Sequence, residues 1–232
     1  MNSNYYEIRY EFAFPDGSSH EFELMLDENT MSLVNFNGES KPPWTKLSHN
    51  QCACCTLGED RHPCCPIAVN IAELVDHFKD RQSIEECLVK CNTPERTCMK
   101  NTTVQAGLYS ILGVVMATSD CPAMSFYKPM ARFHLPFSTT KETLFRSASV
   151  YLLHQYFEYK RGRMPDMEME QLGKKLQQVQ QVNSGILARI RGISAKDADA
   201  NAVIILDSFS RLFEMDIENS LSSLEHLFLA ER

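Results

Sequence analysis

The chain has 232 residues, of which 44% are hydrophobic and 23% charged, with a net charge of −7 and nine cysteines. This length and balance suit one large domain or two small ones, with a core that needs no disulfides to hold it together. The acidic balance argues against a nucleic-acid-binding protein, which usually carries a basic face. The odd number of cysteines argues against a closed disulfide framework.

The N-terminal residues and the apolar runs bear on the compartment. The N-terminus lacks the basic and apolar regions of a signal peptide. The longest strongly apolar run, residues 108–117, is too short to span a bilayer. We therefore expect a cytoplasmic protein with reduced thiols and no membrane partner.

The first part of the chain has the pattern of β-strands. Residues 4–14 and 20–26 alternate apolar and polar side chains, which is typical of half-buried strands. The PDGSS segment between them, residues 15–19, favours a turn, so the two strands form a predicted hairpin. Residues 32–36 are a candidate third strand, and residues 86–91 are a candidate short strand.

The rest of the chain is mostly helical in pattern. The predicted helices cover residues 66–78, 102–119, 140–157, 166–191, 195–213 and 218–231. Pro66 suits the first position of a helix, and Thr139 with Glu142 predicts a capping box for the helix that starts at 140.

These elements predict an α+β fold in one compact domain. Residues 1–43 form a small N-terminal antiparallel sheet, residues 44–66 form a Cys-rich knuckle, and residues 67–232 form a mostly α-helical body.

The knuckle contains the sequence HNQCACCTLGEDRHPCC, residues 49–65, with five cysteines and two histidines. Two-residue gaps between ligands let neighbouring side chains share one zinc ion. The predicted ligands are His49, Cys52, Cys55 and Cys65, with His62 and Cys64 as alternates. A site with four protein ligands is structural, because a catalytic zinc keeps one position for water.

Two other interpretations of the knuckle stay open. An iron–sulfur cluster also uses cysteine thiolates, and Cys121 would then be a distant fourth ligand. Alternatively, the cysteines are buried free thiols that pack as small hydrophobic side chains.

A set of motifs spans most of residues 44–207. They are Cys52-x2-Cys55, Cys65-Pro66-x-Ala68-x-Asn70-Ile71, MATSDCP, PMARFHLPF, ETLFRSASVYLLHQYF and NAVIILD. Together they resemble an uncharacterised bacterial protein family. The resemblance implies a single soluble module in which these motifs carry functional weight, and it implies no activity or ligand.

Polar side chains interrupt the apolar PMARFHLPF motif and continue on the next helix. Because a short link joins the two segments, we expect these side chains to converge around a small anionic ligand. The predicted ligand-binding residues are Arg132, His134, Glu142 and Arg146. Two simpler interpretations compete: His134 is a hydrogen-bonded core residue, and Glu142 forms a local ion pair with Arg146 four residues later.

Cys121 and His134 are the two candidate catalytic residues. Cys121 follows an apolar helix and would be reactive if its thiol pKa were lowered, with His134 as the base. A buried structural cysteine is the competing interpretation.

The helix at 166–191 carries an apolar stripe with one asparagine. The stripe consists of Leu172, Leu176, Val179, Asn183, Ile186 and Ile190, at alternating spacings of four and three residues. Such a pattern is typical of a coiled coil, so a homodimer through residues 172–190 is one interpretation. The stripe is shorter than three heptads, which favours packing against the protein's own helices.

The sequence thus predicts a zinc-stabilised cytoplasmic binding or regulatory module for a protein partner or a small anionic ligand. The alternative is a small-molecule enzyme, of hydrolase or thiol-transfer type, with a pocket centred on Cys121 and His134.

Overall fold

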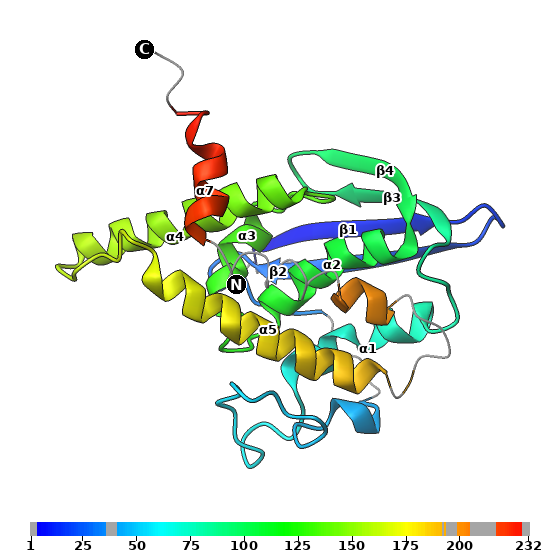
Figure 1. Ribbon diagram of the computed structural model, residues 1–232. Coiled ribbons are helices and arrows are strands. Elements are labelled where there is room, and N and C mark those ends of the chain that lie inside the picture. Colours follow the sequence, from blue (N-terminus) through cyan, green and yellow to red (C-terminus); the bar gives the residue numbers. More distant parts are fainter. Residues whose placement is uncertain (1–3, 36–40, 192, 194–198, 205–216, 229–232) are drawn as a thin grey trace.

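The structure, a computed structural model, describes residues 4–35, 41–191, 193, 199–204 and 217–228. It has the α+β fold predicted from the sequence, with a four-stranded antiparallel sheet and helices packed against it (Figure 1). In the part of the chain described, no helix has both the length and the apolar character needed to cross a membrane.

The sheet has the strand order β2-β1-β3-β4. Strands β1 (Tyr5–Ala13) and β2 (Ser19–Asp27) form the predicted hairpin, and Gly17 in its turn has a φ of +84°. The predicted short strand at 86–91 is β3 (Glu86–Asn92), and it pairs with β1. The edge strand β4 (Thr97–Thr103) pairs with β3.

The prediction of a strand at 32–36 is wrong for residues 32–35, the part of this segment that the structure describes. Only Leu33 pairs there, through a single bridge to Leu26. The sheet is instead completed by β4, which no sequence pattern indicated, because its TCMKNTT sequence is mostly polar and mostly exposed.

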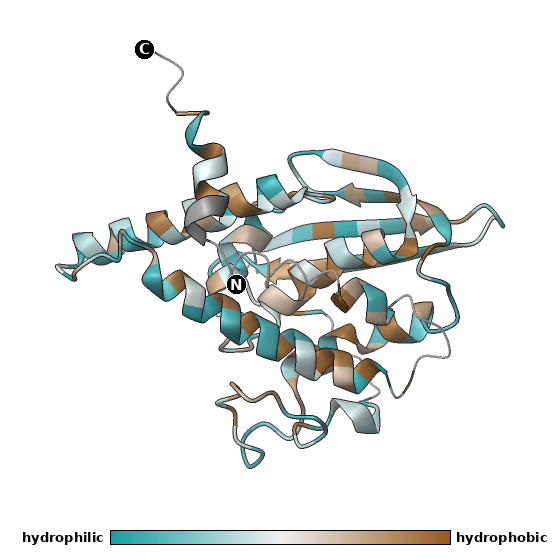
Figure 2. Cartoon of the chain, viewed as in Figure 1, coloured by the Kyte–Doolittle hydropathy of each residue, from teal (hydrophilic) through white to brown (hydrophobic). Residues whose placement is uncertain are grey.

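The two faces of the sheet differ in polarity, as Figure 2 shows by the alternation of brown and teal along the strands. Tyr10, Phe12 and Val89 on one face are completely buried. On the other face Arg9 forms ion pairs with Glu7 at 2.8 Å and Glu21 at 3.0 Å. The apolar face is therefore the one that the helices cover.

Helices α1 (Pro66–Phe78) and α2 (Val104–Thr118) pack on this face. The Phe78 ring lies 4.9 Å from the ring of Phe12. A Cβ atom on Gly107 of α2 would lie only 2.5 Å from the Phe12 ring. Glycine at this position therefore allows the close approach of α2 to the sheet.

The remaining elements pack around α1, α2 and one another. They are η1 (Pro43–Thr45), η2 (Ser125–Tyr127), α3 (Lys128–Arg132), α4 (Thr140–Lys160), α5 (Glu170–Ile190) and α7 (Ile217–Glu225). The capping box of α4 is confirmed, since Thr139 Oγ1 accepts from Glu142 N and Glu142 Oε2 accepts from Thr139 N at 2.7 Å. Of the helix predicted at 195–213, residues 199–204 are helical and most of the others lie outside the described residues.

The apolar stripe of α5 is buried within the chain itself. Its six members are at most 7% exposed and pack in the protein's own core. This is the interpretation that the short length of the stripe favoured.

Candidate functional site

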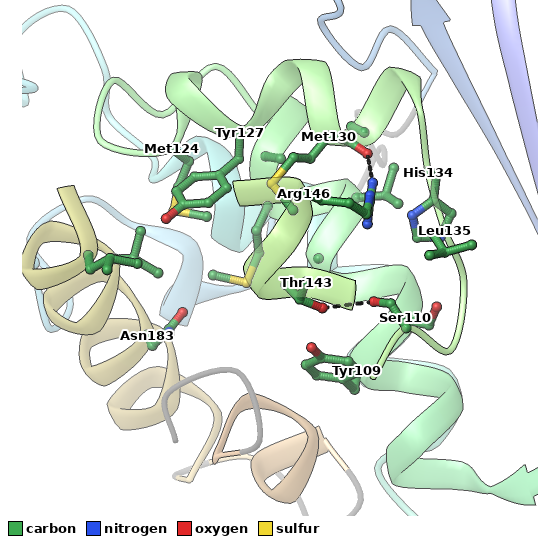
Figure 3. A pocket seen from close by; sticks show the side chains of 18 residues that line it. Tyr109, Ser110, Met124, Tyr127, Met130, His134, Leu135, Thr143, Arg146 and Asn183 are labelled. Atoms are coloured by element: carbon green, nitrogen blue, oxygen red, sulfur yellow. Dashed lines mark hydrogen bonds between the residues drawn. The ribbon is translucent and has the colours of Figure 1, made fainter. Parts of the chain in front are cut away.

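A cavity of about 120 Å³ lies among α2, α3, α4 and α5 (Figure 3). Its apolar walls include Val114, Met116, Met124, Met130, Leu135 and Leu176. A cavity of roughly 150 Å³ with apolar walls is large enough to bind benzene. The cavity is therefore of the size of a small organic molecule.

Helix α2 supplies one wall through residues three and four positions apart, which share a helix face. Tyr109 and Gly113 are two of these residues. A Cβ atom on Gly113 would meet nothing within 4 Å. The absence of a side chain at position 113 therefore leaves open space along this wall.

Arg146 of α4 brings a positive charge to the cavity (Figure 3). Its Nη2 donates to the carbonyl oxygens of Met130 at 2.8 Å and Phe133 at 2.7 Å. The predicted ion pair with Glu142 does not form, because the Glu142 carboxylate accepts from Thr139 in the capping box. Burial lowers the pKa of Arg146, but a guanidinium stays charged at neutral pH.

His134 lies beside Arg146 in the cavity and ends a short hydrogen-bond chain (Figure 3). Its Nε2 is 2.5 Å from the Tyr10 hydroxyl, which is 2.8 Å from Ser110 Oγ. Burial and the charge of Arg146 lower the pKa of His134 to about 3. The imidazole is therefore neutral, and if Tyr10 donates to Nε2 the ring proton is on Nδ1.

Asn183 reaches the cavity from α5 (Figure 3). The residue is only 1% exposed, and its Nδ2 has no hydrogen-bond partner among the residues that the structure describes. A buried polar group without a partner costs about 1–3 kcal/mol of stability. This amide is therefore an unused donor that a bound molecule would satisfy.

The cavity is electropositive although the chain as a whole is acidic. Its polar lining consists of Tyr109, Ser110, Tyr127, His134, Ser138, Thr143, Arg146 and Asn183. No aspartate or glutamate of the described residues lines it. Arg146 is thus a half-buried cation facing a space that contains donors and no carboxylate, which favours an anionic occupant.

Two of the four predicted ligand-binding residues lie outside this cavity. Arg132 stacks on the ring of Tyr6 at 3.9 Å and pairs with Glu95 at 3.3 Å. Glu142 is exposed at the start of α4. The structure therefore brings together His134 and Arg146 only.

Cys121 and His134 line different cavities. Cys121 borders a smaller cavity with other cysteines, and burial raises its pKa to about 11. It is therefore a neutral thiol at neutral pH. The structure does not place His134 beside it as a base.

The structure brings only some of the predicted metal ligands to one cavity. His49 and His62 are exposed, and Cys64 accepts from Thr45 Oγ1 at 3.8 Å. Cys52, Cys55 and Cys65 border the small cavity. Across the described residues, no group of three or more histidines, cysteines or acids is arranged to hold a metal ion as it stands.

Sequence reasoning missed the polar lining residues Tyr109, Ser110, Tyr127, Ser138 and Thr143. Tyr109 and Ser110 lie in an apolar helix without any motif around them, so only the packing of α2 reveals them. Asn183 did give a signal, as the one amide in an apolar stripe.

Comparison with known proteins places the chain in a family. The chain matches no curated protein and no solved structure. One family model, described as Domain of unknown function (DUF6901), matches residues 8–229. Because this match covers nearly the whole sequence, the chain belongs to the DUF6901 family.

Proposed function

We propose that the protein is a binding module for a small organic anion, a monocarboxylate with an apolar body. The observation that carries the proposal is the buried Asn183 Nδ2, which has no partner among the described residues, in the same cavity as the Arg146 guanidinium. An amide N–H and a guanidinium are both donors that suit a carboxylate.

The charge and size of the cavity narrow the class of ligand. Arg146 is the cationic group, because burial keeps His134 neutral. A single negative charge on the ligand would thus be balanced, whereas a dianion would leave one charge buried and unpaired. The volume of about 120 Å³ and the apolar walls suit a body of about one six-membered ring.

The same geometry favours binding over catalysis. An enzyme centred on Cys121 and His134 needs a thiolate and a base within hydrogen-bond distance, whereas these two residues border different cavities. Burial also raises the pKa of Tyr109 and Tyr127, so the cavity's phenols stay protonated at neutral pH.

The proposed metal would have a structural role that is separate from ligand binding. A zinc ion in the Cys-rich segment would stabilise the fold, and no step of ligand binding in the cavity requires it. A role in regulation would follow if the bound anion changes the interaction with a protein partner.

Isothermal titration calorimetry tests the proposal with benzoate and hexanoate as probes and benzyl alcohol as the uncharged control. We expect the carboxylates to bind one site and benzyl alcohol to bind much more weakly. Arg146→Gln should weaken benzoate binding by about 10- to 100-fold, since a hydrogen bond to a charged group contributes about 1.5–3 kcal/mol. Arg132→Gln is the matched control, because Arg132 lies outside the cavity, and should bind as the parent does.

Gly113→Leu separates loss of the ligand site from loss of the fold. The added side chain has open space at this position and would fill the cavity. We expect a folded protein that no longer binds benzoate. Binding that survives both Gly113→Leu and Arg146→Gln, or no carboxylate binding by the parent protein, would refute the proposal.

A further inference from the structure

A second, smaller cavity beside α5 is bordered by thiols from three separate parts of the chain. Cys52 and Cys55 come from the loop after η1, Cys65 precedes α1, and Cys121 follows α2. Figure 1 shows the loop lying below the C-terminal half of α5. The cavity volume is about 20 Å³, which is the space of about one water molecule.

Two of these thiols lie where backbone N–H groups point at sulfur. The backbone N–H groups of Ala68 and Ile67, in the first turn of α1, lie close to the Cys65 sulfur. The backbone N–H groups of Ala123 and Met124 lie close to the Cys121 sulfur. Donors of this kind stabilise a thiolate, as does a helix N-terminus.

Helix α5 closes the cavity from the other side. A Cβ atom on Gly185 would lie 2.5 Å from Cys52 Sγ, so only glycine leaves room for this sulfur. Cys52 Sγ donates to the carbonyl oxygen of Val182 at 3.9 Å. The neighbouring Cys54 also borders this cavity, and its Sγ donates to the carbonyl oxygen of Gln178 at 3.5 Å.

The independent observation is the buried side chain of Arg189. It is 1% exposed, and its Nη atoms donate to the carbonyl oxygens of Trp44 and Lys46, both at 2.7 Å, and of Leu47 at 3.0 Å. Within the part of the chain that the structure describes, its Nε has no hydrogen-bond partner. No carboxylate among the described residues pairs with this guanidinium.

A buried guanidinium needs nearby negative charge, because an unpaired ion in the interior is costly. The Arg189 guanidinium lies near the sulfurs of Cys52 and Cys65. As free thiols these groups are neutral and give the guanidinium no counter-charge. Four thiolates around one divalent ion leave two negative charges, so Arg189 would offset one of them, and the ion would occupy the space between the sulfurs.

We propose that Cys52, Cys55, Cys65 and Cys121 bind one metal centre through four thiolates. Zinc and an iron–sulfur cluster share this ligand chemistry. Cys121 replaces His49 in the set, since the His49 side chain is exposed and does not border the cavity. This proposal is independent of the anion site, which lies in a different cavity.

Binding requires a small rearrangement of the sulfurs. Cys52 must release the Val182 carbonyl and turn inward, because the described thiols are not yet within reach of a single ion. Zinc would draw the four sulfurs toward the existing space, whereas a cluster would expand it and let each iron take one thiolate.

The experiment is metal analysis by mass spectrometry, with an absorption spectrum, on full-length protein purified without an affinity tag and without oxygen. We expect about one zinc per chain, or about four irons with the broad visible absorption of a cluster. Cys65→Ser and Cys121→Ser should each lower the metal content several-fold. Cys64→Ser and Cys98→Ser are the matched controls and should keep it, because neither residue borders the cavity.

Two measurements keep the test decisive if the ligand variants fold poorly. Titration of free thiols in the parent protein should show four fewer reactive cysteines before a chelator is added than after it. Replacement by Co²⁺ should give sulfur-to-metal charge-transfer bands. Parent protein without zinc or iron, a disulfide in place of metal, or equal loss in the control variants would overturn the proposal.

Discussion

Replacing Asn183 with leucine should make the protein more stable while it removes ligand binding. The Asn183 amide is 1% exposed and its Nδ2 has no partner, so the folded state carries a desolvation cost of about 1–3 kcal/mol. Leucine has a similar shape and no polar group, and the adjoining cavity of about 120 Å³ gives it room. We expect the free energy of unfolding to rise by about 1–2 kcal/mol.

Urea unfolding followed by circular dichroism measures this change. For a chain of this size, 1 kcal/mol corresponds to a rise of about 2–4 °C in melting temperature. The same variant should lose the additional stabilisation that saturating benzoate gives to the parent. We expect Asn183→Leu to be more stable and to bind no ligand if the Asn183 amide serves to bind the ligand.

Gln155 offers the matched control, since it is a buried amide whose groups are bonded. Its Oε1 accepts from the N–H of Asp166 at 2.9 Å, and the residue is 7% exposed. Gln155→Met should therefore destabilise the protein by about 1–2 kcal/mol, because it leaves that N–H without a partner. If Asn183→Leu destabilises the protein as much as Gln155→Met does, the Asn183 amide has a partner and the reasoning fails.

Three further changes test the fold and the charge of the site. Gly113→Ala should raise the free energy of unfolding by about 0.5–1 kcal/mol. Gly107→Ala on the same helix should lower it by about 1–2 kcal/mol, because the added Cβ would lie 2.5 Å from the Phe12 ring. Equal effects of the two substitutions in urea unfolding would contradict this packing. The pKa of His134 is about 3 in the folded state and about 6.5 unfolded, so its contribution to stability is complete above pH 6.5 and falls as pH decreases toward 3. The loss should reach about 1 kcal/mol at pH 5.5, and His134→Gln should reduce it; an unchanged pH profile would show that another group is responsible. Thr139→Ala should cost about 1 kcal/mol by removing the capping box, and a thermal melt that does not shift would show that the cap contributes little.

Local patterns predicted most of the fold, and tertiary packing decided what they missed. The hairpin and the α4 capping box follow from alternation and from two residues three positions apart, so a single sequence reveals them. Strand β4 has no apolar alternation because it lies at the edge of the sheet, where β3 is its one strand partner among the described residues. In the SLVNF segment the pattern was present, but only Leu33 forms a bridge.

The candidate site shows a second reason why the sequence did not predict every contact. Glu142 had two available partners, and the capping box took it rather than Arg146. Arg146 therefore turned to the carbonyl groups of Met130 and Phe133 at the cavity. Spacing along a helix names the residues able to pair, but it does not tell which of two competing contacts forms.

Helix α5 connects the two proposed sites. The larger cavity is lined by Leu176, Val179 and Asn183 of this helix. The thiol cavity is bordered by Val182 and Ile186, which both lie within one helical turn of Asn183. Because a helix moves as a rigid element over such a distance, any shift of α5 that accommodates a metal also moves the Asn183 amide. The contacts of Arg189 with the chain around η1 hold this part of α5 in place. A metal centre would therefore fix the geometry of the anion site without contacting the ligand, which gives a physical reason for a binding module to keep a cluster of cysteines.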